Sequence, residues 1–234
     1  LSDSSSSSLF MPKMSLTLSV ITADFVLMEP MIDLAEMLLA RAPVAGRWDG
    51  QLELMGQFGT SRASTAANDL TDLEHRAGSL QMSAGWKFAA AWTPRLAVHY
   101  DYASGDADPK DGTQGRFDPL FGARRFEFGP TGLYGALARS NLNSPGLRAE
   151  VNPSPVLDAM AMWRPAWLAQ AKDAWTTAGL RDATGAAGSF IGQQWEVRLR
   201  WRLLPGNLSL EAGAAWLQRG GFATTAPKAR DVDP

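Results

Sequence analysis

The stretch from residue 191 to residue 204 restricts the fold of this chain more than any other feature of its sequence. Every second residue is apolar, and that face carries Trp195, Val197, Leu199, Trp201 and Leu203. The other face carries Gln194, Glu196, Arg198, Arg200 and Arg202. This period of two predicts a β-strand, because successive side chains of a strand point to opposite faces. Burying an unpaired charge is costly, so the arginine face must meet water.

Other segments repeat this alternation and are also predicted to be strands. They are 46–58, 76–88, 95–102, 147–152, 156–164 and 208–217. A further strand is expected near 15–25, where leucine and valine alternate with threonine and serine, and 31–41 is interpreted as a short helix. We therefore divide the chain into a poorly defined lead over 1–41, either disordered or one strand plus a helix, and a β-rich portion over 42–234.

The connections between these segments alternate in length. Short turns are expected near 93–94, 152–155 and 205–206, and long polar loops near 60–75, 103–145, 165–190 and after 218. Outer-membrane barrels are built in this way, with tight periplasmic turns and longer external loops. A soluble sandwich explains the individual strands equally well, but it gives no reason for this alternation.

The side-chain pattern also predicts the register of the hairpin formed by 191–204 and 208–217. An even-length loop places Trp195 opposite Trp216, Trp201 opposite Leu210 and Arg200 opposite Glu211. Apolar then meets apolar and charge meets opposite charge, as cross-strand pairs prefer. Because proline does not favour the primed two-residue turns, we predict a four-residue loop over 204–207.

Composition supports a barrel in lipid. The chain has 9 tryptophans, which suit a membrane interface, and no stretch of about 18 apolar residues that would form a spanning helix. The net charge of −2 does not indicate the basic surface that nucleic-acid binding requires, and the absence of cysteine suits an exported chain. About eight strands make a barrel filled by its own side chains. The many inward charges favour a wider, wet lumen, so we expect a fragment that begins inside a longer precursor and lacks final strands.

The segment from Asp101 to Gly146 carries several long motifs. These are YASGD (102–106), RFDPLFGARR (116–125), FGPTGLYG (128–135) and SPGLR (144–148). They resemble the signature region of the alginate-export family of outer-membrane porins, and RAPVAGRWDGQLEL (41–54) and WLAQAKDAW (167–175) fit as well. The resemblance covers about 42–225 and leaves residues 1–40 outside.

The resemblance implies an all-β fold, an antiparallel up-and-down transmembrane β-barrel of roughly 18 strands, of which this chain supplies the C-terminal half. It implies a non-enzymatic channel that passes an anionic, alginate-like polysaccharide through the bacterial outer membrane. The expected partners are that polymer, outer-membrane lipid and periplasmic export-complex proteins. No cofactor and no metal are expected.

Arginine suits a polyuronate channel, because its planar fork binds a carboxylate through two hydrogen bonds and stays charged. By strand parity, the predicted lumen residues are Arg198, Arg200, Arg202, Arg148, Arg164, Lys87 and Arg95. In the long loop, Arg124 and Arg125 are expected to constrict the lumen, and Asp118 and Asp101 belong to the same motif. The competing interpretation is a Glu/Arg network that only braces the wall, with Arg200 and Glu211 as one pair.

Other functions are also compatible with parts of the sequence. A general anion-selective porin would use the same cations without a polymer. An outer-membrane hydrolase would need a pair such as Ser83 and His99, although no nucleophile motif surrounds Ser83. A calcium loop at Asp106, Asp108 and Asp111 is disfavoured, because a lysine falls where the next ligand should be. A soluble sugar-binding sandwich is the fourth possibility.

Overall fold

The computed structural model describes residues 15–22, 32–62, 71–119, 135–204 and 206–229. They form one large antiparallel sheet in the order β1-β2-β3-β4-β5-β7-β8-β11-β12. The strands are β1 (Ser15–Thr22), β2 (Ile32–Arg41), β3 (Arg47–Arg62), β4 (Asp72–Lys87), β5 (Arg95–Ala103), β7 (Leu142–Ser154), β8 (Leu157–Trp167), β11 (Phe190–Leu204) and β12 (Leu208–Arg219). The predicted all-β, up-and-down antiparallel architecture is confirmed.

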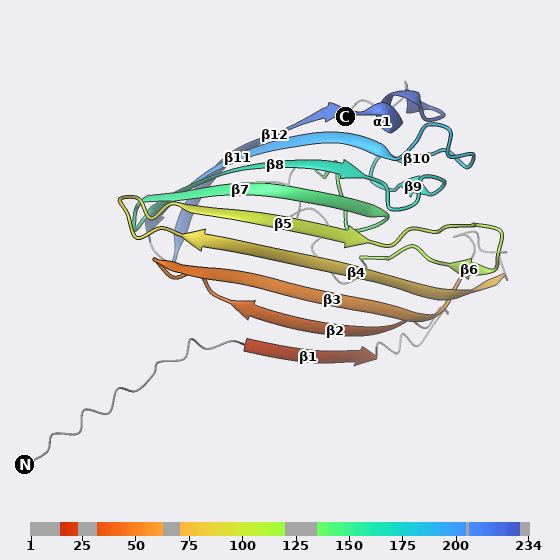
Figure 1. The fold of residues 1–234 in the computed structure, drawn as a ribbon, viewed down its shortest axis with the longest axis horizontal. Helices are drawn as coiled ribbons and strands as arrows, with labels where there is room; N and C mark the ends of the chain where they lie inside the picture. Colours follow the sequence, from red (N-terminus) through yellow and green to blue (C-terminus); the bar gives the residue numbers. More distant parts are fainter. Residues whose placement is uncertain (1–14, 23–31, 63–70, 120–134, 205, 230–234) are drawn as a thin grey trace, which may run out of the picture.

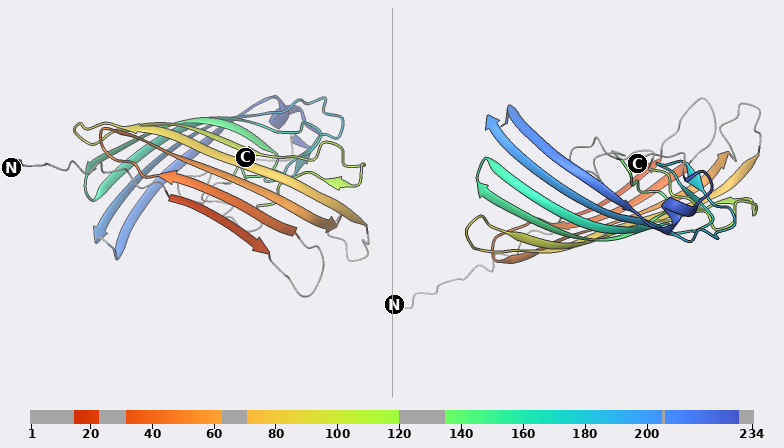
Figure 2. Two further views of the ribbon diagram at one scale, coloured as in Figure 1. Left: turned by 60° about the horizontal axis from the view of Figure 1, so that its bottom comes forward. Right: turned by 90° about the horizontal axis from the view of Figure 1, so that it is seen from above.

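The sheet curves into a trough, with β1 and β12 at its two edges (Figures 1 and 2). Strands of 9 to 16 residues make up most of it between β3 and β12. A tilted strand of about 9–11 residues spans a bilayer, so these strands are long enough to cross a membrane.

Each strand predicted from 46 onward is present, and β1 confirms the strand expected near 15–25. The short helix predicted over 31–41 is wrong, because Ile32–Arg41 is strand β2 and pairs with both β1 and β3. The segment is rich in leucine, methionine and alanine, which favour helices, but pairing on both edges outweighs this propensity. Strand β7 begins at Leu142, five residues before the prediction, because Pro145 and Gly146 interrupt the apolar alternation.

Short turns and long loops lie at opposite ends of the sheet, as predicted (Figure 1). Residues 42–46, 88–94, 155–156 and 205–207 connect strands at what we call the turn end. The long connections 104–141 and 168–189 leave from the loop end and contain the two-residue strands β6 (Thr113–Gln114), β9 (Ala174–Trp175) and β10 (Leu180–Arg181). Chain polarity therefore alternates regularly across the sheet.

The predicted register of the β11–β12 hairpin is confirmed, with Trp195 opposite Trp216, Trp201 opposite Leu210 and Arg200 opposite Glu211. Its predicted four-residue loop is wrong. Leu204 pairs with Leu208, and an irregularity between Arg202 and Leu204 shifts the register by one residue, which leaves a three-residue connection over 205–207. Gly206 has a φ of +84°, a conformation that glycine adopts without steric cost.

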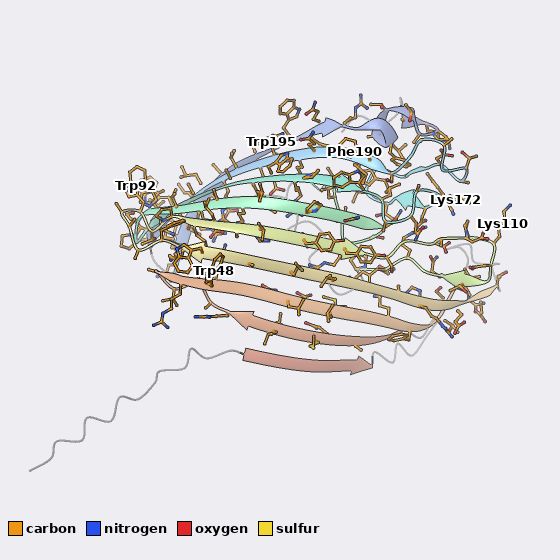
Figure 3. The ribbon with its side chains drawn as sticks, viewed as in Figure 1. Trp48, Trp92, Lys110, Lys172, Phe190 and Trp195 are labelled. Carbon is orange, nitrogen blue, oxygen red and sulfur yellow. The ribbon has the colours of Figure 1, made fainter. Side chains whose placement is uncertain are left out.

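The convex face of the sheet is apolar and exposed. Its large exposed side chains are Trp48, Leu54, Phe58, Met82, Leu96, Val98, Leu147, Trp195, Val197, Leu199, Trp201, Leu210 and Trp216. Aromatic residues lie toward both ends of the strands. Trp48 and Trp86 meet edge to face near the turn end with ring centroids 5.1 Å apart, and Trp163 and Trp195 lie 5.9 Å apart nearer the loop end. Figure 3 labels one member of each pair, Trp48 and Trp195. Such bands are typical of the two interfaces of a membrane barrel.

The hydrophobic core lies at the loop end rather than between two sheets. It contains Ala103, Phe117, Leu137, Leu142, Ala166, Leu168, Trp175, Leu180, Ile191, Phe222, Ala223, Ala226 and Ala229. Helix α1 (Gly221–Thr225) contributes Phe222, which is fully buried, and packs against β11. The helices in the described part of the chain include none long and apolar enough to cross a membrane. The core thus fixes the long loops at one end of the sheet.

Candidate functional site: the charged lumenal face

The concave face of the sheet, here called the lumenal face, carries the charged residues. Strand pairing places all seven predicted lumen residues from the strands on it: Lys87, Arg95, Arg148, Arg164, Arg198, Arg200 and Arg202. The same face carries the carboxylates of Asp49, Glu53, Asp101, Glu150, Asp158, Glu196 and Glu211. The face is therefore a mixed array of both signs, not a purely cationic surface.

The three arginines of β11 divide between two carboxylates. Arg198 and Arg202 both bind Asp158 on β8, at 2.9 Å and 2.6 Å. Arg200 lies directly opposite Asp158 in register, yet its Nε binds Glu211 on β12 at 2.7 Å. The side chains of Arg200 and Arg202 keep 36% and 38% of their surface exposed, so water reaches both guanidinium groups.

Two other arginines are buried and cross a neighbouring strand to find their partners. Arg95 on β5 reaches over β4 to Asp49 on β3, with 2.5 Å between Nη2 and Oδ1, and it also contacts Glu150 on β7 at 3.2 Å. A Cβ on Gly85 of β4 would stand 2.7 Å from the Arg95 guanidinium. The absence of a side chain at Gly85 therefore opens the path for this crossing.

Arg164 on β8 makes the equivalent crossing over β7. Its Nη1 lies 3.0 Å from Asp101 on β5, and its Nε lies 3.7 Å from Glu196 on β11. A Cβ on Gly146 of β7 would stand 2.8 Å from the Met162 methyl group and 3.5 Å from the Arg164 Cβ. Both crossings pair a buried arginine with a carboxylate two strands away, so each fastens three strands together.

Arg148 and Lys87 are the two remaining predicted residues. Arg148 binds Glu150 on its own strand at 2.6 Å and is 26% exposed. Lys87 lies between Arg47 and Arg95 in register, near the turn end. Among the described residues, no carboxylate lies within ion-pair distance of Lys87. Lys87 therefore stands in a row of cations.

The residues that the sequence placed in the long loop motif differ in where the structure puts them. Asp118 lies against the wall, where its backbone carbonyl accepts from the Gln57 amide at 2.6 Å and its N–H donates to Gln57 Oε1 at 2.9 Å. Asp101 does not lie in the loop, because β5 continues to Ala103 and the Asp101 carboxylate faces Arg164. Arg124 and Arg125 lie outside the described residues.

Strand periodicity did not reveal Arg139, which comes from the loop before β7. Its side chain is only 7% exposed; one guanidinium nitrogen lies 3.4 Å from Glu53 Oε1, and the other donates to Gln81 Oε1. Arg139 comes four residues after the last residue of the FGPTGLYG motif, so the motif-rich segment was the only available signal.

A buried polar cluster joins the long connections at the loop end. The carboxylate of Asp173 is inaccessible to solvent; it binds the Arg116 guanidinium and accepts the backbone N–H of Asp106 at 2.8 Å. The hydrogen bond to Asp173 raises the pKa of Arg116, while burial and the nearby Asp173 charge raise the pKa of Asp106. Asp173 belongs to the WLAQAKDAW motif and Asp106 to YASGD, so these motifs build the loop core.

The alternative sites receive little support. Ser83 lies opposite His99 in register on the lumenal face, but no hydrogen bond between them is among those described. Asp108 and Asp111 accept backbone N–H groups of Lys110 and Thr113, which closes local turns. Within the described part of the chain, no group of three or more His, Cys, Asp or Glu could hold a metal ion.

The sequence model for alginate export matches residues 38–231, a span that covers the whole sheet from the end of β2 onward. The chain belongs to the alginate export family. This is a family of outer-membrane transport porins rather than enzymes. The match begins four residues before the resemblance seen in the sequence and ends six residues after it. A search of curated proteins gave no match.

Proposed function

We propose that the lumenal face conducts an anionic polysaccharide of the alginate type through the bacterial outer membrane. The observation that carries this proposal is the division of the guanidinium groups into two sets. Arg95 and Arg164 are buried and brace the wall, whereas Arg148, Arg200 and Arg202 keep 26%, 36% and 38% of their side-chain surface exposed on the same face. Export needs the second set, because only an accessible cation can meet a carboxylate in transit.

The exposed arginines suit a moving polymer because each already has a carboxylate partner in the wall. A uronate that binds Arg202, for example, competes with Asp158 rather than filling an empty site. Such exchange lowers the net affinity of each site, and a pore requires binding that admits the substrate and still releases it. Alternate residues of one strand lie about 6.6 Å apart, so Arg198, Arg200 and Arg202 offer successive positions along the wall.

The turn end supplies the first cations that a polymer from the periplasm meets. Short turns of barrels face the periplasm. Arg202 binds the Pro155 carbonyl of the β7–β8 turn at 3.3 Å, and Arg47 and Lys87 lie where β3 and β4 meet their turns. Periplasmic export-complex proteins would contact the same end. The convex face with its aromatic bands would contact outer-membrane lipid.

A general anion-selective porin is the second candidate, because exposed guanidinium groups also attract small anions. The two candidates differ in how an oligouronate affects ion current across a planar lipid bilayer. The polymer channel predicts block by oligouronate but not by a neutral oligosaccharide of equal length. A general porin predicts similar anion selectivity with no block that depends on uronate length.

The test replaces Arg200 and Arg202 together with glutamate in the full chain reconstituted into a bilayer. We expect loss of oligouronate block and a shift of selectivity toward cations. Arg181→Glu is the matched control, since Arg181 lies on an external loop and its Nε binds the Lys172 carbonyl at 3.1 Å. Unchanged block and unchanged selectivity in the double variant would refute a role for these two arginines in conduction.

A further inference from the structure

Residues 104–119, the first part of the β5–β7 connection, turn back onto the sheet at the loop end. Strand β6 lies beside β4 (Figure 1), with Gln114 opposite His75. Farther along, the backbone of Asp118 makes two hydrogen bonds with the side-chain amide of Gln57, a lumenal residue of β3 that is only 1% exposed. Asp118 therefore lies on the lumenal side of the wall and narrows the passage at this level.

The contacts of Gln57 determine which nitrogen of His75 carries a proton. The amide nitrogen of Gln57 donates to the Asp118 carbonyl at 2.6 Å, and its Oε1 accepts the Asp118 N–H at 2.9 Å. These two bonds fix the orientation of the amide, so the Gln57 atom that lies 3.2 Å from His75 Nε2 is the oxygen. Because this oxygen only accepts, Nε2 carries the proton and Nδ1 is the bare nitrogen of a neutral imidazole.

The other ring nitrogen has no room for a second proton. His75 is 2% exposed, and its Nδ1 is buried without a hydrogen-bond partner among the described residues. A proton at Nδ1 would create a buried cation and a buried donor without an acceptor, and both are unfavourable. The protonated ring reaches water only if the neighbouring part of the connection moves.

His75 lies outside the hydrocarbon layer. Its neighbours on β4, Glu74 and Arg76, point to the convex face, where they pair with each other at 2.5 Å and are 54% and 67% exposed. Charged residues on the lipid side of a barrel strand are costly within the bilayer. This part of β4 therefore extends beyond the membrane, where the pH of the medium at the loop end acts on the imidazole.

Few charges act on the imidazole. On the two elements that flank it, the register partners are Gly59 of β3 and Gln114 of β6, both uncharged. The connection contributes the Asp118 carboxylate, and its Arg116 is already bound to a buried carboxylate of the loop core. Burial lowers the pKa of His75, and the charge of Asp118 raises it by less. The neutral form is therefore favoured while the connection is docked.

We propose that His75 is an acid-sensitive clamp, which holds Asp118 on Gln57 at neutral pH and releases it when the imidazole is protonated. Release widens the outlet at this level. A lowered pKa in the docked state means that the clamp is fully stable above the unperturbed value, about 6.5, and weakens as pH falls below it. The clamp itself is independent of any substrate, whereas its effect on transport rests on the proposed export function.

The first experiment measures hydrogen exchange at two adjacent amides by NMR, in the full chain in nanodiscs. The Asp118 N–H bonds to Gln57, whereas the Phe117 N–H bonds to the Ser104 carbonyl at 3.0 Å within the connection. Between about pH 7.5 and 5.5, the protection factor of Asp118 should fall, by at most about tenfold per pH unit for one proton, while that of Phe117 stays constant. An unchanged Asp118 amide, or equal losses at both amides, would overturn the clamp.

Two histidine variants identify the group that responds. His75→Gln keeps an amide that can donate to Gln57 but does not titrate, so the protection of Asp118 should become independent of pH. The chain has 2 histidines, and His99→Gln is the matched control that should keep the wild-type response. Asp106, in the same connection, has a raised pKa and is the competing source of a pH response. A response that survives in His75→Gln would refute the clamp.

The protonation state of His75 is itself measurable. Nitrogen chemical shifts distinguish the two neutral tautomers of an imidazole, and we expect the Nε2–H form at neutral pH because Nε2 faces the Gln57 oxygen. His99→Gln assigns the signals, since it leaves only those of His75. A proton found on Nδ1 instead would contradict the geometry on which the clamp depends.

Bilayer recordings test the outlet and separate the clamp from the export function. Lowering the pH to about 5.5 on the loop side should raise the conductance of the wild-type channel more than that of His75→Gln; equal responses would refute the widening of the outlet. If oligouronate blocks the channel but the Asp118 amide does not respond to pH, the clamp is wrong and the export function stands. If Asp118 responds but oligouronate never blocks, the export function is wrong and the clamp stands.

Discussion

The guanidinium of Arg95 on β5 lies 2.5 Å from the carboxylate of Asp49 on β3, although β4 runs between them. Gly85 leaves the space that this crossing needs. Arg164 makes a comparable crossing over β7 to reach Asp101. These bridges assign part of the arginine content to the wall itself, whereas Arg200 and Arg202 stay partly exposed.

The buried bridge should contribute strongly to stability. Asp49→Ala removes one partner of a buried pair, and such a loss typically costs about 3–5 kcal/mol, here reduced because Glu150 still contacts Arg95. We expect a loss of about 2 kcal/mol in urea unfolding from lipid vesicles. Asp72→Ala breaks the partly exposed Arg62–Asp72 pair and should cost about 0–1 kcal/mol. Equal losses of unfolding free energy in Asp49→Ala and Asp72→Ala would contradict a structural role for the buried Arg95–Asp49 pair.

The path of the bridge gives a second prediction. Gly85→Val places a branched side chain where the Arg95 guanidinium lies, so it should disrupt the Asp49 contact without removing either charge. We expect Gly85→Val to destabilise the sheet by about as much as Asp49→Ala, and the two changes together to cost clearly less than their sum, because they remove one interaction. Additive losses would show that Gly85 acts independently of Arg95.

Asp158 offers a test of the exposed arginines that leaves every cation in place. It binds both Arg198 and Arg202, so Asp158→Asn releases two guanidinium groups from a carboxylate, whereas Glu211→Gln releases only Arg200. We expect greater anion selectivity and tighter oligouronate block in both variants, with the larger effect for Asp158→Asn. Reversal potentials and block constants in bilayers measure this, and weaker block in Asp158→Asn would contradict substrate exchange on this wall.

Local alternation was sufficient to predict much of this fold. The register of the β11–β12 hairpin follows from its side-chain pattern, because a shift of one residue would exchange the two faces. The same reasoning failed for β2, whose leucines, methionine and alanines fit a helix until pairing with β1 and β3 is considered. Strand identity there depends on neighbours far away in the sequence.

The site was predictable by face and only in part by partner. Strand parity placed Arg198, Arg200 and Arg202 on the lumenal face, and the hairpin register predicted the Arg200–Glu211 pair, which the structure confirms. No partner for Arg198 or Arg202 was predicted, because both bind Asp158 diagonally on β8, a strand whose register with β11 was not predicted. Arg139 escaped prediction because it lies in a loop without periodicity, and its contacts with Glu53 and Gln81 join residues 86 and 58 positions apart. Such contacts depend on the loop's three-dimensional path.

The β8–β11 loop should respond to acid through Asp182. Hydrogen bonds from the Thr184 hydroxyl and from the backbone N–H groups of Ala187 and Thr184 lower the pKa of Asp182. A lowered folded-state pKa means that the stabilisation is present above the unfolded value, about 3.9, and is lost as pH falls through the folded value. The protection factors of the amide hydrogens in 182–188, measured against the intrinsic exchange rate at each pH, should therefore be high at pH 5 and fall below about pH 4. Asp182→Ala should exchange rapidly at both pH values, and a wild-type loop equally protected at pH 3 would contradict this role.

Asn141 provides the last prediction, because its backbone conformation and its side-chain hydrogen bonds contribute separately to the stability of the β5–β7 connection. Asn141→Gly keeps the positive φ accessible but loses the amide that binds Gln170 and Ala174, whereas Asn141→Ala also adds the cost of a left-handed backbone, roughly 1–2 kcal/mol. Both variants should increase protease cleavage within 104–141 and 168–175, with Asn141→Ala the more sensitive. The rank order tests the backbone contribution, since loss of hydrogen bonds alone predicts equal cleavage or a more labile glycine variant. If neither variant is cleaved faster than wild type, Asn141 does not anchor the end of the β5–β7 connection.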